Sequence, residues 1–498
     1  MDMNIAETFR DGTIFVTGST GFLGKLLVEK LFRSCSLKKV AILVRSKKGL
    51  SSCRRAADIY NESVFDCLRK EKPDFLTKIK IIDGDLEQTS LGLSSEDHEW
   101  LIENGNFVFH CAATVRFNET LQTATKINIL GTDNILNLAT KMRNLKGLVH
   151  VSTAYSHCPR NVIKEKFYPV LITVKELKNM SIDEISCANI LGNWPNTYTF
   201  TKAIAENLIL DNHNQLPISI FRPSIIGCTQ SEPYPGWLDT INGPSGIVTG
   251  TITGILRAIC VDKAKITDII PVDYTVNALI SVMWDTVNRY QRSEHTKNVP
   301  KIYNYVSSFE SPLTWDRFIK EIRNHYFEVP PLRSVWYLYE IFYTNLLFGI
   351  ILKFWLHTVP AALMDFLLII CGKSPKTLKM YAKIEKMLNL LNVFTTKQWS
   401  FDNKNTRKLW SILSKEDRDV FWFSLEEFDW EAYLKIYYFG IRKYILHEDY
   451  SNKEKAVSKN RKARSQNLAD FYGLDPKFSQ KNFFGQILSD VPEFRPPL

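Results

Sequence analysis

The stretch TGSTGFLG, Thr17 to Gly24, decides the fold of this chain. It follows directly on the apolar run Thr13 to Val16, which is typical of a β-strand, and it leads into the helical pattern KLLVEKLFRS. A glycine-rich strand-to-helix turn permits a tight bend, close approach of backbone N–H groups to a pyrophosphate, and close packing of helix on strand. The pattern, with G-x-x-G-x-x-G spacing, predicts a dinucleotide site. It comprises Thr17, Gly18, Ser19, Thr20, Gly21, Phe22, Leu23 and Gly24.

The second expected strand, Lys39 to Val44, ends in Arg45, and Lys47 and Lys48 come next. An NAD-binding chain places an acidic residue here for the ribose 2′-hydroxyl, whereas cations suit a 2′-phosphate. The sequence therefore predicts NADPH as the cofactor, bound in part by Arg45. The two lysines also fit a solvated basic turn.

Three further strand ends are expected to reach the cofactor. The run IKIIDGDL ends at Asp85 and Leu86, and FVFHCAA ends at Cys111, Ala112 and Ala113. Open parallel sheets present such tips to the adenine and the nicotinamide, although either tip also fits a purely structural role. Pro223 and Ile225, in ISIFRPSII, complete the predicted cofactor contacts.

A proton donor for reduction is predicted at Tyr198, followed by Lys202 in YTFTK. Residues four apart share one helix face, so the Lys202 ammonium can lower the pKa of the phenol and bind the nicotinamide ribose. Y-x-x-x-K arises easily by chance, but it occurs only once in this chain. Its position between a strand ending in hydroxyls and the strand ISIFRPSII favours catalysis.

The hydroxyl partner of Tyr198 is predicted at the end of the strand LVHVST. Thr153 is preferred to Ser152 because it lies closer to the carboxyl tip, where it can hydrogen-bond the substrate oxygen. Asn128, in the preceding helix, is a candidate for organising a proton relay and for binding cofactor. A solvated or capping asparagine is the alternative interpretation.

The composition of the chain indicates which binding partners and which cellular compartment to expect. The chain has 498 residues and a net charge of +10, which suits an anionic membrane surface or an anionic CoA ester. Nucleic-acid-binding motifs are not found in it, and we expect no nucleic-acid partner. Nine scattered cysteines without a C-x-x-C pair indicate a reducing compartment, with no disulfide framework and no metal site. The termini, MDMNIAETFRDG and EFRPPL, predict no targeting signal.

Apolar runs alternate with helical patterns from residue 13 to about 285, which predicts an α/β fold with a doubly wound parallel Rossmann-type sheet. We expect an NADP(H)-binding domain over residues 1–285, with an irregular substrate loop at Tyr234 to Gly250. After it we expect a connecting region (286–334), a hydrophobic segment (335–372) and a mainly helical C-terminal domain (373–450). A basic, partly disordered tail (451–498) is expected to be solvated or attracted to anionic membrane.

The hydrophobic segment has two interpretations. Ile341 to Leu352 is free of charge, but Lys353, His357, Pro360 and Asp365 interrupt the apolar residues after Leu352, so a conventional spanning helix is not expected. Either a buried helical pair forms the wall of an acyl pocket, or a hairpin enters one leaflet. The short apolar runs favour burial.

Together these motifs resemble the eukaryotic alcohol-forming fatty acyl-CoA reductases, a family of the extended short-chain dehydrogenase/reductase superfamily. TGSTGFLG, FHCAATVRF, HVSTAY, YTFTK, FRPSII and PGWLDTINGPSGI are shared with many extended reductases. LHTVPAALMDF, FTTKQWSFDN and WEAYLKIYYFGIRKYIL are more specific, and they extend the resemblance over nearly the whole chain. Insect members often carry another hydrophobic segment near the C-terminus. None occurs after Leu446, so membrane attachment would depend on residues 335–372.

The resemblance implies reduction of a long-chain fatty acyl-CoA to the primary alcohol by two NADPH, with release of CoA through a bound aldehyde. It also implies the cytoplasmic face of the endoplasmic reticulum membrane, with the peroxisome membrane or lipid droplet as alternatives. Acyl chain length and oligomeric state stay open. A hydroxysteroid dehydrogenase or sugar-nucleotide epimerase explains residues 13–285 equally well but not the C-terminal residues. A non-catalytic lipid- or NADPH-binding protein has no need of Tyr198.

Overall fold

The computed structural model describes residues 3–47, 49–170, 172–179, 188–213, 216–292, 299–449, 451 and 453–472. Lys48 and residues 473–498 of the predicted tail lie outside the described residues. The chain divides into two compact units. The first unit comprises Met1–Tyr234, Asp268–Pro312 and Gln398–Phe428, and the second comprises Pro235–Thr267, Leu313–Lys397 and Asp429–Leu498.

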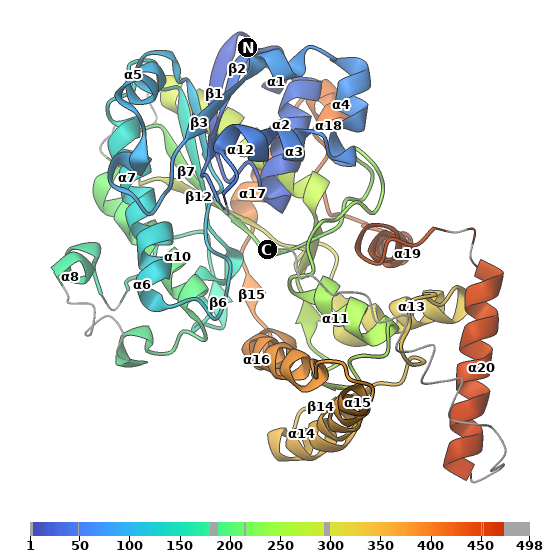
Figure 1. Ribbon diagram of the computed structural model, residues 1–498. Helices are drawn as coiled ribbons and strands as arrows, with labels where there is room; N and C mark the ends of the chain where they lie inside the picture. Colours follow the sequence, from blue (N-terminus) through green and yellow to red (C-terminus); the bar gives the residue numbers. More distant parts are fainter. Residues whose placement is uncertain are drawn as a thin grey trace. The chain divides into compact units, whose positions relative to one another are not determined.

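A seven-stranded parallel sheet forms the centre of the first unit (Figure 1). Its order is β12-β7-β5-β4-β1-β2-β3, so successive strands run to one side of β1 and then to the other. Dinucleotides bind at such a reversal, beyond the carboxyl ends of the strands. The strands are β1 (Gly12–Thr17), β2 (Leu37–Val44), β3 (Ile79–Asp83), β4 (Phe107–His110), β5 (Gly147–Val151), β7 (Ile218–Pro223) and β12 (Lys301–Tyr305).

Helices cover both faces of this sheet and explain its continuously apolar strands. Helices α2 (Phe22–Ser34) and α12 (Val272–Gln291) pack together on one face, and α7 (Gly131–Ala139) and α10 (Thr197–Asn212) lie on the other (Figure 1). The arrangement confirms the predicted doubly wound fold. The remaining helices and short strands of this unit are α1 (Ile5–Thr8), α3 (Ser52–Tyr60), α4 (Asp66–Glu71), α5 (Ser95–Asn104), α6 (Leu121–Ala124), α8 (Val174–Asn179), α17 (Lys404–Ile412), α18 (Lys415–Val420), β6 (Val162–Ile163), β8 (Ile225–Gly227), β11 (Ile269–Pro271) and β15 (Ser400–Phe401).

The first unit extends beyond residue 285, the limit expected from the sequence, which falls inside α12. Strand β12 pairs in parallel with β7 and completes the sheet. Residues 398–428 also return to this unit, where β15 pairs with β6 and the Trp399 indole donates to the carbonyl of Cys158 at 2.9 Å. These are long-range pairings, which local periodicity does not reveal.

The second unit is mainly helical, as predicted, and has an aromatic core. Trp430, Tyr433, Tyr437 and Tyr438 of α19 are buried, and the Tyr438 hydroxyl donates to the carbonyl of Val329 at 2.6 Å. Its elements are β9 (Ala258–Cys260), β10 (Ile266–Thr267), β13 (Leu313–Thr314), β14 (Ile341–Tyr343), α11 (Pro244–Ile252), α13 (Trp315–Glu328), α14 (Leu346–Lys353), α15 (Val359–Ile370), α16 (Thr377–Thr396), α19 (Trp430–Gly440) and α20 (Lys453–Tyr472).

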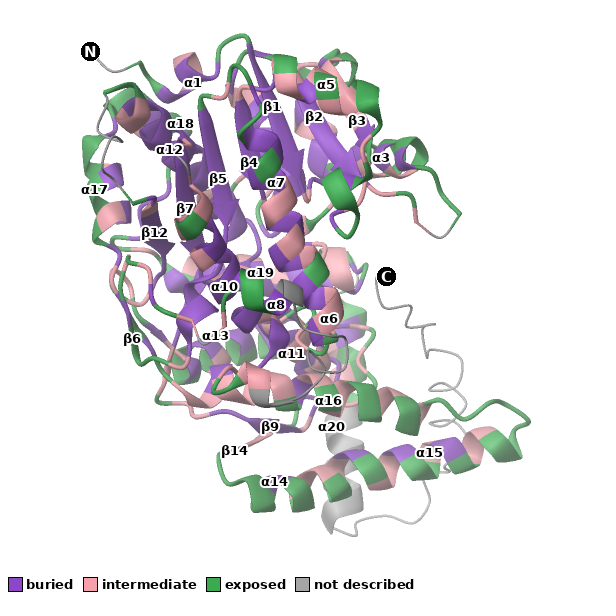
Figure 2. Cartoon of the chain, turned by 90° about the vertical axis from the view of Figure 1, so that its left-hand side faces the viewer, coloured by how far each residue is buried: buried purple, intermediate pink, exposed green. Residues whose placement is uncertain are grey.

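The hydrophobic segment differs from the buried pair that the sequence favoured. Helix α14, a π-helical turn (Phe354–Thr358) and α15 form one helix, Leu346–Ile370, which we call the apolar rod. By length and composition the apolar rod could cross a membrane, and only 17% of its most apolar window is buried. Figure 2 shows it mostly exposed, alongside α16. None of the four predicted interruptions ends the helix. Pro360 falls in the first turn of α15, directly after the π-helical turn, and Lys353, His357 and Asp365 share one side of the helix.

The start of the tail is also more regular than expected. Residues Lys453–Tyr472 form the helix α20, which carries the basic cluster that the sequence assigned to a partly disordered arm. The cluster comprises Lys453, Lys455, Lys459, Arg461, Lys462 and Arg464.

Candidate active site

The glycine-rich loop is built so tightly that two of its positions exclude a side chain. Gly18 has a φ of +76°, and a Cβ there would lie 2.7 Å from the backbone nitrogen of Ala112. A Cβ on Gly24 would lie 2.1 Å from the carbonyl oxygen of Gly18. The loop therefore brings β1, the start of α2 and the tip of β4 together.

The loop leaves the N-terminus of α2 available to an anion. Gly21 is the N-cap and supplies no side-chain hydrogen bond to the first turn. Gly21 is exposed, Thr20, Phe22 and Leu23 are half-buried, and Ser19 is buried. The positive end of a helix attracts a pyrophosphate, so these residues suit a dinucleotide.

Thr17 and His110 fix the strand tips beneath the loop. The Thr17 hydroxyl lies 2.8 Å from Nδ1 of His110 and accepts the N–H of Ala112 at 3.2 Å. Burial lowers the pKa of His110 to about 3, and the charge of Lys202 adds to that lowering, so the ring is neutral. Burial also raises the pKa of the neighbouring Cys111 thiol to about 12. Ala112 and Ala113 are half-buried beside it.

Arg45 occupies the predicted position beyond β2. Its Nη1 lies 3.4 Å from a carboxylate oxygen of Asp85 and 3.4 Å from one of Glu87, and its side chain is 42% exposed. Arg55 of α3 donates to the carbonyl of Arg45. Burial lowers the pKa of Arg55, and the charge of Arg45 lowers it further.

The guanidinium group of Arg55 therefore lies at the same strand end as Arg45, and the charge of Arg45 acts on it. Arg55 was missed from sequence, although it continues a basic run through Arg45, Lys47 and Arg54 that could have indicated it. Leu86, on the adjacent tip, is buried against the position of Gly131.

Asn128 is fully buried, so it is neither solvated nor a surface cap. Its side chain accepts the N–H of Thr114 at 2.9 Å and donates to the hydroxyl of Thr201 at 2.9 Å. It lies on a π-helical segment (Thr125–Leu130), an irregularity that is frequent at functional sites. Asn128 thus connects the loop after β4 to α10, next to Lys202.

Thr153, Tyr198 and Lys202 meet beyond the tip of β5. Burial raises the pKa of Tyr198 to about 12, against the lowering effect of hydrogen bonding by the Thr153 side chain. Burial lowers the pKa of Lys202 to about 8, against the raising effects of Cys111 and Glu206, and its ammonium donates to the carbonyl of Val151 at 2.7 Å. The pKa of Tyr198 is thus set by burial, which raises it, and by Thr153, which lowers it. The sequence had predicted that the Lys202 ammonium lowers this pKa.

Ser152 has a different partner from Thr153. Its hydroxyl donates to Glu206, which lies one helix turn beyond Lys202 on α10. Glu206 also accepts from Nε of Arg222 at 2.9 Å and lies 3.0 Å from Nε2 of His157. Both Glu206 and Arg222 are fully buried. The charge of Arg222 and the hydrogen bond of His157 hold the pKa of Glu206 well below its usual range despite burial.

Pro223 and Ile225 lie at the same edge of the sheet. Pro223 ends β7, and Ile225 begins β8 with its N–H bonded to the carbonyl of Asp268 at 3.0 Å. Carboxyl ends of parallel strands share one edge, so the structure gathers the predicted residues of β1, β4, β5 and β7 around one site.

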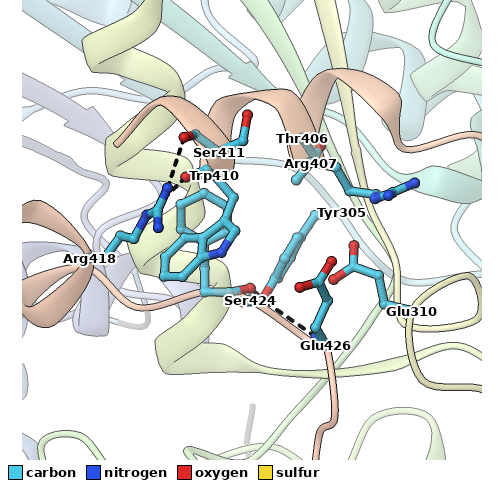
Figure 3. A pocket seen from close by; sticks show the side chains of 10 residues that line it. Tyr305, Glu310, Thr406, Arg407, Trp410, Ser411, Arg418, Ser424 and Glu426 are labelled. Carbon is cyan, nitrogen blue, oxygen red and sulfur yellow. Dashed lines mark hydrogen bonds between the residues drawn. The ribbon is translucent and has the colours of Figure 1, made fainter. Parts of the chain in front are cut away.

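A separate cavity of about 280 Å³ lies in the same unit (Figure 3). Among the described residues, its lining contains none of those predicted for the site. The Arg418 side chain there donates to the carbonyls of Trp410 and Ser411, and Glu310 accepts from Asn403 at 2.7 Å. These groups bond to the protein itself, which indicates a structural role. The lining is Tyr305, Glu310, Thr406, Arg407, Trp410, Ser411, Arg418, Phe423, Ser424 and Glu426.

Comparison with known proteins identifies the family of this site and fold. Two family profiles described as male sterility protein match residues 16–279, an NAD-binding region, and residues 356–448. The Drosophila melanogaster protein "Fatty acyl-CoA reductase wat" is 37% identical over 94% of this chain and 91% of its own length. The chain belongs to the fatty acyl-CoA reductase family. "Fatty acyl-CoA reductase 1" of Rattus norvegicus is 37% identical over 90% of the chain and 87% of its own length.

Membership of the fatty acyl-CoA reductase family makes the chain an oxidoreductase with a nicotinamide-dinucleotide-binding domain. Solved reductase domains share the fold. The terminal R domain of the myxalamid PKS-NRPS pathway has a TM-score of 0.58 at 20% identity, covering 90% of this chain and 96% of that domain. The R domain of a nonribosomal peptide synthetase from Mycobacterium tuberculosis has a TM-score of 0.58 at 18% identity, covering 87% and 91%.

Proposed function

We propose that this protein reduces a long-chain fatty acyl-CoA to the primary fatty alcohol, with two NADPH consumed and CoA released. The observation that carries the proposal is the meeting of Thr153, Tyr198 and Lys202 at the edge of the dinucleotide-binding sheet. Family membership supports the substrate class, since the relatives are named fatty acyl-CoA reductases. The net charge of +10 suits the anionic CoA.

In the first reduction, Thr153 and Tyr198 stabilise negative charge on the thioester oxygen. A reduced nicotinamide cofactor, when bound at this edge of the sheet, would supply the hydride that the carbonyl carbon accepts. The side chains of Thr153 and Tyr198 are close enough to interact, so both can approach one developing oxyanion. Collapse of the resulting hemithioacetal re-forms the carbonyl, breaks the carbon–sulfur bond and expels CoA as its thiolate. The aldehyde stays bound.

In the second reduction, Tyr198 donates a proton to the oxygen of the aldehyde. Its pKa of about 12 keeps the phenol protonated at neutral pH, which is the form that a donor needs. Lys202, with a pKa of about 8, is mostly an ammonium ion at neutral pH and can bind the nicotinamide ribose. Asn128 positions the loop after β4 against α10.

NADPH is the proposed cofactor because of Arg45 and Arg55. Two adjacent guanidinium groups repel one another, and a 2′-phosphate between them would relieve that repulsion. Arg45 is more than one-third exposed and its two carboxylate contacts are long, so it is free to turn toward an anion.

The proposed location is the cytoplasmic face of the endoplasmic reticulum membrane, with the peroxisome membrane or a lipid droplet as alternatives. A long-chain substrate partitions into lipid, and the apolar rod supports a membrane surface as partner.

The test compares wild-type protein with Tyr198→Phe on a panel of acyl-CoAs and NADPH. We expect Tyr198→Phe to lose about 100-fold or more in turnover with unchanged folding, in line with general acid catalysis. Tyr339→Phe, at an exposed tyrosine, is the matched control and keeps wild-type turnover. Near-wild-type turnover in Tyr198→Phe would refute the proposal. A protein that never releases thiol from any acyl-CoA would instead be a dehydrogenase, an epimerase or a non-catalytic binder.

A further inference from the structure

The apolar rod contacts its own unit along one side, which we call the seam and where Leu352 and Leu356 also pack against Ala258, Cys260 and Tyr343. Lys353, His357 and Asp365 are the ionisable residues of Leu346–Ile370, and they recur at multiples of four, on one side of the helix. All three have partners within the second unit. Lys353 pairs with Glu385 of α16 at 2.7 Å, and Nε2 of His357 accepts the N–H groups of Arg257 and Ala258 at 3.0 and 3.3 Å.

Asp365 completes the seam at the far end of the rod. Its carboxylate accepts the N–H groups of Lys376, Thr377 and Leu378 at 3.0, 2.8 and 3.0 Å, and so caps the N-terminus of α16. Every ionisable group of the rod is therefore satisfied by protein, and none needs water on the outer face.

The outer face is apolar over the length of the rod. Leu347 is 74% exposed, Trp355 63% and Ile370 66%. Exposed apolar surface of this extent marks an interaction site in a folded protein. The other exposed members are Leu346, Phe348, Ile350, Ile351, Phe354, Leu363, Phe366 and Ile369.

The seam also decides how the rod can meet lipid. Lys353 and Asp365 are twelve residues apart, or about 18 Å along the helix, and both bond to α16. A rod that crossed the bilayer would draw α16, with its lysines, into the hydrocarbon, which is costly. A rod lying in the membrane plane immerses its outer face and leaves the seam on the protein side.

Helix α16 supplies positive charge beside the rod. Lys379, Lys383 and Lys386 are exposed and recur at i, i+4 and i+7, so they share one face. The opposite face holds α16 to its unit, because Tyr381 donates to the carbonyl of Ile255 at 2.9 Å. The single acidic residue of α16, Glu385, is the one that pairs with Lys353.

We propose that the apolar rod lies in the plane of one leaflet of an anionic membrane, with the Lys379, Lys383 and Lys386 stripe on the lipid headgroups. The inference rests on the membrane-surface location proposed above and does not depend on the chemistry. Long lysine side chains can reach headgroups from a helix at the interface.

The test is co-sedimentation of the full chain with phosphatidylcholine vesicles, with and without phosphatidylserine. We expect binding to both, and about 100-fold tighter binding to the anionic vesicles, from about fivefold per lysine. Lys379→Gln/Lys383→Gln/Lys386→Gln removes that preference and keeps binding to neutral vesicles. Ile351→Glu/Phe366→Glu binds neutral and anionic vesicles more than about 100-fold more weakly than the wild type, since two apolar side chains no longer enter the hydrocarbon. Leu76→Glu, at an exposed leucine of the first unit, is the control and binds as wild type.

Turnover of a short, soluble acyl-CoA separates this inference from the catalytic one. If only membrane binding is lost, the triple lysine variant and Ile351→Glu/Phe366→Glu both keep wild-type turnover of that substrate. Thr344→Cys and the native Cys371 flank the rod and are tested for labelling by a membrane-impermeant maleimide added outside vesicles, with peptide mapping. Labelling of both supports the in-plane position. Labelling of only one of the two cysteines would overturn it, and so would unchanged vesicle binding by Ile351→Glu/Phe366→Glu. It would also be overturned if the wild-type protein did not bind vesicles and instead formed a dimer that Ile351→Glu/Phe366→Glu dissociates.

Discussion

Glu206 provides the sharpest stability prediction, because it is a fully buried carboxylate one helix turn beyond Lys202. It accepts hydrogen bonds from Ser152 and Arg222 and contacts His157, and both Glu206 and Arg222 are inaccessible to solvent. Glu206→Gln leaves a buried guanidinium without its counter-charge. Breaking one side of such a pair costs about 3–5 kcal/mol. Arg222 keeps hydrogen bonds to the carbonyls of Lys164 and Lys166 at 3.1 and 3.2 Å, so we expect about 3 kcal/mol.

The assay is urea denaturation followed by circular dichroism. At a slope of about 3 kcal/mol per molar, the transition of the first unit should move down by about 1 M. Glu7→Gln, which breaks the exposed pair with Arg10 at 2.6 Å, is the control and should cost less than about 1 kcal/mol. Glu206→Leu/Arg222→Met, which removes both charges, should be more stable than Glu206→Gln.

The pH dependence of this stability comes from the lowered pKa of Glu206. A carboxylate whose pKa is lower in the folded protein stabilises it at pH values above the unfolded pKa, and that contribution is lost as the pH falls. Equal midpoints for Glu206→Gln and Glu7→Gln at neutral pH would refute the reasoning.

Three other predictions concern Lys202 and the residues proposed to bind the cofactor. Because Lys202 has a pKa of about 8 and acts as an ammonium ion, kcat/KM should fall as the pH rises through about 8, and a profile flat to pH 10 would contradict that role. Gly24→Ala should raise the KM for NADPH more than about tenfold, since its Cβ would lie 2.1 Å from a backbone oxygen. Gly21→Ala should raise this KM less, because its Cβ would lie 3.3 Å from the nearest backbone oxygen. Arg45→Asp should shift the kcat/KM ratio of NADPH to NADH toward NADH by about 100-fold, and an unchanged ratio would exclude a 2′-phosphate contact.

The fold was predictable where local pattern sets it. Gly18, Gly21 and Gly24 between a strand and a helix imply a doubly wound sheet, and the structure confirms that sheet. The spacing of Tyr198 and Lys202 predicted that both lie on one helix, and both lie on α10. The choice of Thr153 over Ser152 as the catalytic hydroxyl stays a prediction.

Features that depend on distant contacts were not predictable. The partners of Glu206 come from β7 and from the turn after β5, and no local pattern joins them. Lys353 and Asp365 look like interruptions in an apolar run until α16 is known to satisfy both. Because these contacts with α16 cannot be read from the sequence, burial of the hydrophobic segment was expected, whereas most of its surface is exposed.

The most direct test of the central claim is the stoichiometry of one turnover. Purified protein in detergent or vesicles is given a long-chain acyl-CoA and NADPH, and cofactor oxidation, free CoA and the organic product are measured together. We expect a primary fatty alcohol, with two NADPH oxidised for each CoA released. Aldehyde as final product at one NADPH per CoA would contradict the second reduction, and NADPH binding without any thiol release would contradict the assigned reaction itself.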